Sequence, residues 1–95
     1  MSTPTPVRLA SLPEAAVELL RAVHDALDIP LPGLTDKDEH AHTRLLETRA
    51  REARVTLATV LDQGHEVGPA ARTLRVWTAQ CPVAYTPWID DGGAA

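Results

Sequence analysis

The longest regular pattern in the chain is a stretch without helix breakers from residue 35 to residue 63, which ends just before Gly64. The stretch contains no proline or glycine and is rich in Ala, Leu, Arg and Glu, which favour helix. Thr35 suits the N-cap and acidic residues fill the first turn, so the pattern predicts one long helix over about residues 36–63. The positions of its predicted buried stripe are His42, Leu46, Ala50, Ala53, Leu57, Val60 and Leu61.

This predicted helix is long for so short a chain. At 1.5 Å per residue it would extend roughly 40 Å, whereas a compact domain of this chain length has a radius of gyration of about 12 Å. The helix should therefore reach the edge of the globule, which favours an elongated helical hairpin or a dimer. Ala50 and Ala53 are small residues in the middle of the stripe, where another helix can approach closely.

A shorter helix is predicted before the long one. Ser11 as N-cap, Pro13 in the first turn and Glu14 three residues after the serine match a capping box. The apolar stripe of this helix comprises Leu12, Ala16, Leu19, Leu20, Val23 and Leu27. Residues 29–34 contain two prolines and a glycine, so they should end the helix and form a stiff connector that folds onto the end of the core.

A third helix is predicted after Gly64, which suits the left-handed position behind a helix end. It should begin near Gly68-Pro69 and end before Pro82, because proline is tolerated only in a first turn. Its stripe comprises Ala70, Leu74, Trp77 and Cys81. The segment 82–89 is too short and too rich in proline for a helix, so we expect it to run extended along the helices and to bury Trp88.

Together these elements predict an all-α fold, a three-helix domain with one long central helix and with an arm and a tail packed on the helices. We expect an extended arm over residues 1–10, a single domain over 11–89 and a disordered tail over 90–95. The two shorter helices can lie end to end along the long one, or overlap in a bundle from which the long helix projects. Either arrangement leaves apolar surface for the tail or a second copy of the chain to cover.

Composition narrows the possible functions. The 95 residues carry a net charge of −4, which argues against bulk binding to nucleic acid or to an anionic membrane surface. A single cysteine rules out an internal disulfide, and no stretch has the apolar length of a membrane helix or a signal peptide, so we expect a cytoplasmic protein. Abundant Ala and Arg beside one lysine and no asparagine indicate a GC-rich, bacterial coding sequence.

Side chains capable of chemistry are sparse and scattered. His40 and His42 lie two residues apart and would point to different sides of a helix, so they cannot share a metal. A site combining His42 with His24 and Asp28 is conceivable, but edge-of-core positions are the more ordinary reading of both histidines. Cys81 would lie at a helix C-terminus, which disfavours a thiolate. We therefore expect no enzymatic activity, no cofactor and no metal site.

The distribution of arginine is the strongest charged signal. Residues 44–76 carry six arginines against four acidic residues, whereas residues 1–43 carry three basic against seven acidic ones. Two readings remain open for this basic half. It can be an ordinary solvated surface of mixed charge, with Arg49 at its flank. Alternatively, the third helix reads DNA in a helix–turn–helix through Arg72 and Arg75, with Arg51 and Arg54 of the long helix nearby.

The aromatic residues suggest where a partner could bind. Tyr85 and Trp88 lie in the non-helical tail, and such residues dominate interface hot spots, although in a small protein they are commonly core. Val55 points away from the stripe of the long helix and is a further candidate contact. The leading prediction is a non-enzymatic helical binding protein, accessory or regulatory, that contacts a protein partner or a second copy as a homodimer. The alternative is a small DNA-binding regulator.

Overall fold

The computed structural model describes residues 12–89 and contains three α-helices in that range. They are α1 (Glu14–Leu27), α2 (Asp36–Leu61) and α3 (Val67–Gln80). Within the described residues the β-type pairing is a single antiparallel bridge between Pro32 and Pro87, so the all-α prediction is confirmed. The predicted arm and the predicted disordered tail lie outside the described residues.

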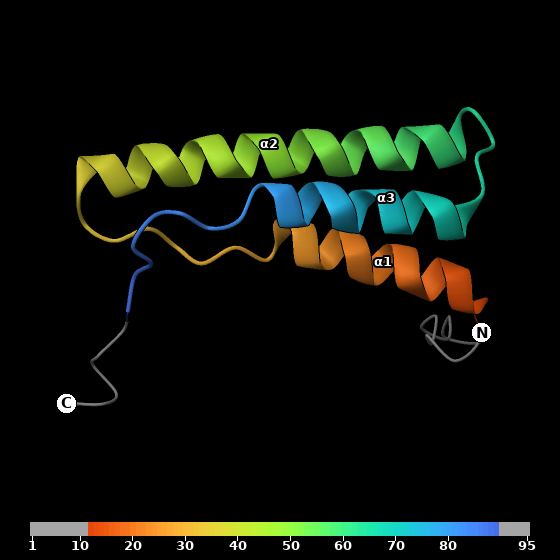
Figure 1. Ribbon diagram of the computed structural model, residues 1–95, viewed down its shortest axis with the longest axis horizontal. Coiled ribbons are helices and arrows are strands. Elements are labelled where there is room, and N and C mark those ends of the chain that lie inside the picture. The colour runs from red at the N-terminus through yellow and green to blue at the C-terminus, as the bar shows by residue number, and fades with distance from the viewer. Residues whose placement is uncertain (1–11, 90–95) are drawn as a thin grey trace, which may run out of the picture.

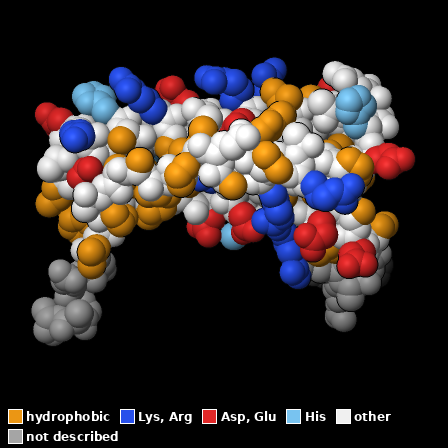
Figure 2. Space-filling model, in the orientation of Figure 1, with side chains coloured by type: hydrophobic (Ala, Val, Ile, Leu, Met, Phe, Trp, Pro, Cys, Tyr) orange, Lys and Arg blue, Asp and Glu red, His pale blue; other side chains and the backbone are white. Residues whose placement is uncertain are grey.

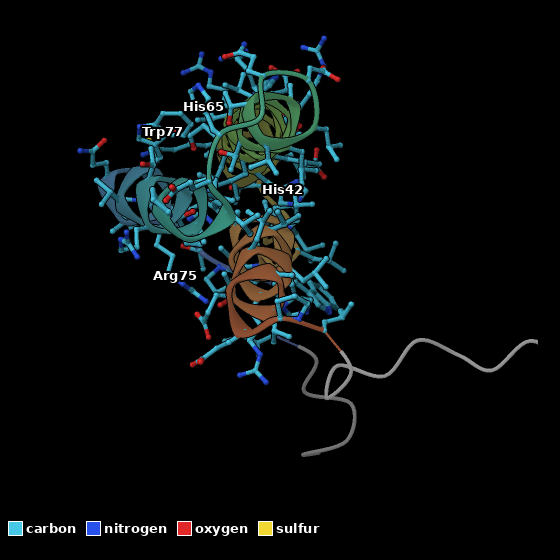
Figure 3. All side chains as sticks on the ribbon, turned by 90° about the vertical axis from the view of Figure 1, so that its right-hand side faces the viewer. His42, His65, Arg75 and Trp77 are labelled. Carbon is cyan, nitrogen blue, oxygen red and sulfur yellow. The ribbon has the colours of Figure 1, made fainter. Side chains whose placement is uncertain are left out.

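The two short helices lie side by side against one half of the long helix (Figure 1). Both α1 and α3 run antiparallel to α2, and the end-on view of Figure 3 shows the three axes roughly aligned. Of the two arrangements left open by the helix lengths, the overlapping bundle is therefore the one found. The N-terminal turns of α2 project beyond the bundle, and the connector after α1 and the tail after α3 run beneath these turns.

Local sequence signals set most of the helix ends. The Thr35 hydroxyl accepts a hydrogen bond from the Asp38 N–H at 3.1 Å, which caps α2 as predicted. Gly64 takes a φ of 71°, the left-handed conformation that lets the chain turn back into α3. The predicted N-cap of α1 was wrong, because Pro13 and not Ser11 holds that position. Ser11 itself lies outside the described residues.

The core is small and rich in alanine. Its buried members come from α1 and α3, and partly buried residues of all three helices complete it: Leu19, Ala22, Ala26, Ala71 and Leu74, with Val23, Leu57, Val60, Val67 and Trp77 around them. Leu74 is the largest side chain with no exposed surface. Alanines at the contact between α1 and α3 let these two helices approach closely, because helix separation depends on the side chains between them.

The predicted stripes of α1 and α2 are only partly right, because each lies to one side of the face that is buried, whereas the predicted stripe of α3 is buried or half-buried throughout. On α1, Leu20 and Leu27 are exposed while Ala22 and Ala26 are buried. On α2 the buried residues are Arg49, Ala53 and Thr56, whereas Leu46, Ala50 and Leu61 are exposed. The physical reason is that the apolar residues of α1 and α2 cover a wider part of each helix's circumference than the neighbouring helices can bury.

The connector and the tail pair with each other below the first turns of α2 (Figure 1). Around the Pro32–Pro87 bridge, the Gly33 N–H donates to Thr86 O at 2.8 Å and the Trp88 N–H donates to Leu31 O at 2.7 Å. A Cβ on Gly33 would lie 2.9 Å from a carboxylate oxygen of Asp38 and 3.1 Å from that same Thr86 oxygen, so a larger residue there would have to displace one or both. The tail is tied to α2 by the Thr86 N–H, which donates to the Asp38 carboxylate.

Candidate interaction surfaces

Arg49 is buried at the point where the C-terminal ends of α1 and α3 meet the middle of α2. Its Nη1 donates to Ala26 O at 2.9 Å and its Nη2 donates to Cys81 O at 2.8 Å, and the residue is only 4% exposed. Both carbonyls belong to the last turn or the cap of a helix, where partial negative charge accumulates. One guanidinium therefore satisfies and electrostatically stabilises two helix ends.

The placement of Arg49 at the flank of a solvated arginine face was therefore wrong. Its buried position depends on two helix ends that are distant from it in sequence, by 23 and 32 residues. The spacing of residues along α2 carries no signal of that convergence. Both terminal nitrogens of its fork donate to backbone inside the protein, and its Nε is buried with no hydrogen-bond partner among the described residues, so Arg49 belongs to the fold and not to a solvated arginine face.

The four arginines of the DNA-binding alternative are differently placed. Arg75 of α3 forms ion pairs with α1, to Asp25 at 3.0 Å and to Glu18 at 3.9 Å. Hydrogen bonds from His24 and then Arg75 hold the pKa of the Asp25 carboxyl below its usual value. The remaining arginines are exposed: Arg72 on α3, and Arg51 and Arg54 on α2.

The surface around these arginines is of mixed charge. Figure 2 shows basic side chains along the outer edge of α2 and interleaved acidic and basic side chains over α1 and α3. The axes of α2 and α3 are roughly aligned, whereas the two helices of a helix–turn–helix cross steeply. These observations weigh against DNA binding by α3, which stays a prediction.

The candidate metal residues are not brought together. The ring of His42 packs edge-on against Tyr85, with 5.6 Å between ring centroids, while His24 is exposed and hydrogen-bonded to Asp25. Among residues 12–89, no three His, Cys, Asp or Glu side chains converge in a way that could hold a metal ion. Cys81, half-buried, contributes its backbone carbonyl to Arg49.

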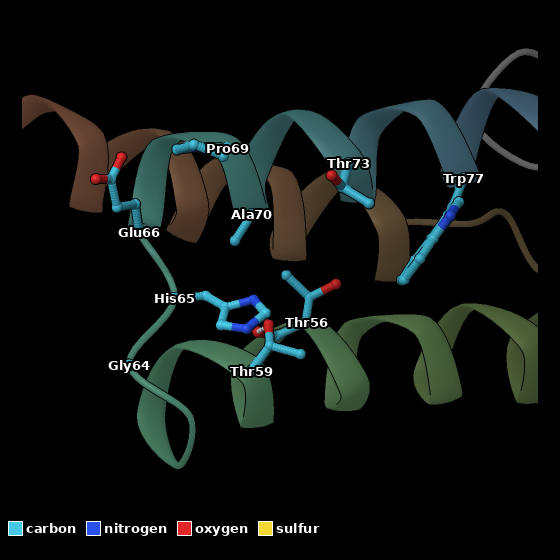
Figure 4. Close-up of a pocket in the computed structure, with 9 residues that line it drawn as sticks. All are labelled: Thr56, Thr59, Gly64, His65, Glu66, Pro69, Ala70, Thr73 and Trp77. Carbon is cyan, nitrogen blue, oxygen red and sulfur yellow. Dashed lines mark hydrogen bonds between the residues drawn. The ribbon is translucent and has the colours of Figure 1, made fainter.

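A hollow of about 490 Å³ lies between α2 and α3 at the end where the two helices are joined (Figure 4). Its lining is Thr56, Thr59, Gly64, His65, Glu66, Pro69, Ala70, Thr73 and Trp77. The Thr56 hydroxyl donates to Glu52 O and the Thr59 hydroxyl donates to Thr56 O, so both are committed to the helix backbone. The hollow therefore presents the ring of Trp77 and threonine hydroxyls that are already hydrogen-bonded, and we find no nucleophile paired with a base in its lining.

The three residues predicted to contact a partner occupy different environments. Tyr85 is 7% exposed and its hydroxyl donates to Pro30 O, so it fixes the tail to the connector. Trp88 is 46% exposed, and the expectation that it would be buried was therefore wrong. Val55 is exposed on α2, and within the described residues no contact joins it to either tail aromatic. Of the two tail aromatics, Trp88 is the one that a partner could reach.

Alkaline pH should loosen the tail, because burial raises the pKa of the Tyr85 phenol, with a smaller opposing effect of the Arg49 charge. The folded state thus holds this proton more tightly than the unfolded state, where tyrosine titrates near pH ~10. The stability linked to Tyr85 is fully present below that pH and is lost as the pH rises through the higher folded value. Tyr85 is the one tyrosine of the chain, so phenolate absorbance reports on it directly. The absorbance midpoint should be higher in native protein than in concentrated urea; equal midpoints would contradict the burial of the ring.

The leucines that the bundle leaves exposed gather on one side of it. On α1, Glu18 and Asp25 point towards Arg75 of α3, and Leu20 and Leu27 each follow two residues later. Two residues turn a helix by roughly 200°, so both leucines point away from α3.

The same reasoning places the exposed apolar residues of α2. Thr59 lines the hollow shared with α3, and Leu57 and Leu61, two residues on either side of it, point away from α3. Leu46 and Ala50 continue that row at helical spacing. We call this side the outer apolar face, made of Leu20 and Leu27 of α1 with Leu46, Ala50 and Leu61 of α2. Leu57 points to the same side but is partly buried against the core.

Comparison with known proteins returns no relative: no protein-family model, no curated protein and no solved structure matches this chain. Within residues 12–89, none of the three helices combines the length and the apolar character that crossing a membrane would need. Assignment of a function therefore depends on the surfaces described above.

Proposed function

We propose that this protein is a non-enzymatic helical binding protein, accessory or regulatory, that acts through protein–protein contacts at the outer apolar face. The observation that carries the proposal is the collection of exposed leucines on the side opposite α3. Leu46 is 41% exposed and Leu61 is 77% exposed, and Leu20 and Leu27 of the neighbouring helix are exposed as well. Contiguous exposed apolar patches on soluble domains commonly mark interaction sites.

The free energy of burying leucine favours an outer apolar face that a partner covers over one that stays in water. Complete burial of a leucine side chain stabilises by roughly 1.5–3 kcal/mol, so covering a half-exposed one contributes about 1 kcal/mol. Leucine at these positions is not required by the bundle, because the core is completed by other residues of α1 and α2. A polar side chain would serve a purely structural α2 equally well at Leu46 or Leu61, whereas a binding surface explains leucine at both.

Affinity capture from native lysate tests the proposal, with the full chain as bait and with or without nuclease. The wild-type protein is compared with a Leu46→Glu/Leu61→Glu double variant and with Leu34→Glu, a matched control that lies in the connector and is also exposed. We expect retained protein, including untagged copies of the chain, to depend on the two α2 leucines and to persist after nuclease.

Two results would contradict this proposal. The retained protein could be the same for all three baits, which would place binding elsewhere on the molecule. Alternatively, the retained material could vanish with nuclease and with a combined Arg72→Glu/Arg51→Glu change, which would favour the DNA-binding alternative. Circular dichroism of each bait verifies that the helical fold is intact before capture.

A further inference from the structure

We propose that the paired connector and tail form a second docking site, which binds a basic and apolar segment of a partner protein. The site is the ribbon patch, made of Leu31 in the connector with Trp88 and Ile89 in the tail. None of these residues belongs to the outer apolar face, so the inference goes beyond the proposed function. It is carried by the exposure of the three side chains, by the stiffness of the backbone that holds them and by the charge around them.

The ribbon patch brings large apolar side chains together on two neighbouring stretches of backbone. Leu31 is 66% exposed and Ile89 is 68% exposed, and Trp88 is exposed with them. The Trp88 N–H donates to Leu31 O at 2.7 Å, which holds these two residues side by side next to the bridge. Figure 2 shows hydrophobic side chains gathered at this end of the molecule, below the first turns of α2. The bundle core is completed without them, and tryptophan is among the residues most enriched in interface hot spots.

The backbone that presents the patch is stiff. Leu31 lies between Pro30 and Pro32, and Trp88 directly follows Pro87. Each proline ring fixes its own φ, and two backbone hydrogen bonds join the connector to the tail. Ordering a segment on binding costs conformational entropy, so a preformed surface loses less free energy on association than a flexible one. The ribbon patch is therefore prepared for binding by the fold.

The same prolines decide how a partner can engage the ribbon. The two hydrogen bonds of the pairing are donated by Gly33 and Trp88, which directly follow the bridged prolines. In an antiparallel pair, the residues between such bonds direct their own N–H groups outwards, and Pro32 and Pro87 have no N–H. Neither edge offers that donor to an added strand, which favours contact through the side chains of the ribbon patch.

The surroundings of the patch are acidic. Residues 28–39 and 82–89 contain four acidic residues against one basic residue, Lys37. The sequence adds Asp90 and Asp91 directly after Ile89, although both lie outside the described residues. Negative charge repels a nucleic acid or an anionic membrane and attracts a basic protein segment. The sign of the charge therefore indicates a partner that carries arginine or lysine beside its apolar side chains.

Several of these carboxylates are placed where a partner can reach them. Asp28 and Asp36 are exposed at the two ends of the connector, and the Asp38 carboxylate lies at the ribbon, where it accepts the Thr86 N–H at 3.2 Å. None of the ion pairs among residues 12–89 involves any of the three. An arginine of the partner can pair with these groups or lie over the ring of Trp88, because a guanidinium is attracted to the face of an aromatic ring.

Selection from a displayed library of random short peptides tests the inference, with the full chain as the immobilised target. Peptides that combine arginine or lysine with apolar residues should be enriched over the input library, and acidic peptides should be depleted. Three exposed side chains make a small contact, so we expect weak and reversible binding. A selection that returns no peptide, or only peptides without basic residues, overturns the inference.

Substitutions assign the best selected peptide to the ribbon patch. Trp88→Ala and Leu31→Ser should each weaken its binding by about tenfold, the loss expected for a central interface residue, as measured by fluorescence anisotropy of the labelled peptide. The matched control is Val76→Ala, an exposed apolar position on α3, which should bind like the wild type. Circular dichroism verifies the fold of each variant. Unchanged binding by Trp88→Ala would place the peptide elsewhere and overturn the assigned patch.

Two aspartates in equivalent positions test the role of charge. Asp28 and Asp62 are the exposed C-cap residues of α1 and α2, but only Asp28 adjoins the connector. Asp28→Lys should weaken peptide binding by about threefold and reduce its dependence on salt, whereas Asp62→Lys should change neither. A peptide with its basic residues replaced by glutamate should bind Asp28→Lys/Asp36→Lys better than it binds the wild type. Equal effects of Asp28→Lys and Asp62→Lys would show that only net charge attracts the peptide, against a site at the ribbon.

Two further measurements test other occupants and separate this inference from the proposed function. Leu46→Glu/Leu61→Glu should bind the peptide like the wild type, and loss of binding there would overturn a separate site. Flotation with phosphatidylserine vesicles should leave the chain unbound, whereas vesicle binding that Trp88→Ala abolishes would replace the protein partner with a membrane surface. Peptide binding at the ribbon patch together with failed capture at the outer apolar face would keep this inference and reject the proposed function.

Discussion

Replacing Arg49 with methionine should lower the free energy of unfolding by about 3 kcal/mol. The change removes two charged hydrogen bonds to the carbonyls of Ala26 and Cys81. Hydrogen bonds to charged groups contribute about 1.5–3 kcal/mol each, and a buried acceptor left without a partner adds its own desolvation cost. Methionine recovers part of this through packing. Urea unfolding followed by circular dichroism measures the difference.

Two companion variants separate the role of the guanidinium fork from that of charge. Arg49→Lys keeps the charge but has a single terminal nitrogen, so it should recover only part of the loss, because one ammonium cannot match the fork that reaches both helix ends. Arg51→Met changes an exposed arginine on the same helix and should alter stability by less than about 0.5 kcal/mol. If Arg49→Met were as mild as Arg51→Met, the two helix ends would not depend on this side chain.

Features of the fold that depend on neighbouring residues could be predicted from the sequence. The long helix follows from a run without proline or glycine, and its cap follows from Thr35 and Asp38 three residues apart. Gly64 is similar, since a left-handed position at a helix end favours glycine locally. In each case the residues that determine the feature lie within a few positions of one another.

The burial of Arg49 could not be predicted, because it depends on where two other helices end. The sequence pattern gives only the direction in which Arg49 points around the axis of α2, and an arginine side chain usually lies in solvent. In this fold, α1 and α3 end at the same level and leave two carbonyls directed at α2. That coincidence is a property of the assembled bundle.

The rotation of the predicted stripes has a different cause. A hydrophobic pattern reports the full apolar sector of a helix, whichever molecule covers it. On α2 the sector includes Ala53, which the bundle buries, and Leu46 and Leu61, which it leaves exposed. The candidate interaction face was thus present in the pattern, but only the packing of α1 and α3 divides the sector into core and exposed surface.

The second large effect that we expect on the free energy of unfolding is in the tail, where truncation of its two aromatic residues should have very different costs. Tyr85→Ala should lower the free energy of unfolding by about 3 kcal/mol, because buried aromatic side chains truncated to alanine cost roughly 3–5 kcal/mol and this one lies at the edge of the fold. Trp88→Ala removes an even larger ring that is half-exposed, and it should cost less than about 1 kcal/mol. Chemical denaturation of the full chain measures both.

This contrast follows from the contacts of the two rings and not from their size. The ring of Tyr85 packs edge-on against His42 of α2, and its hydroxyl donates to Pro30 O in the connector. Trp88 follows the bridge at Pro87 and is 46% exposed, so less of its surface is buried by the fold.

Tyr85→Phe isolates the hydroxyl, whose hydrogen bond to Pro30 O should account for about 1 kcal/mol of the total. Equal losses for Tyr85→Ala and Trp88→Ala would mean that the tail packs with both rings, and its exposed tryptophan would then be part of the core. A large loss at Tyr85 alone leaves Trp88 dispensable for folding. Any loss of binding in Trp88→Ala can then be attributed to a direct contact, because the helices, the connector and the pairing of the tail remain intact.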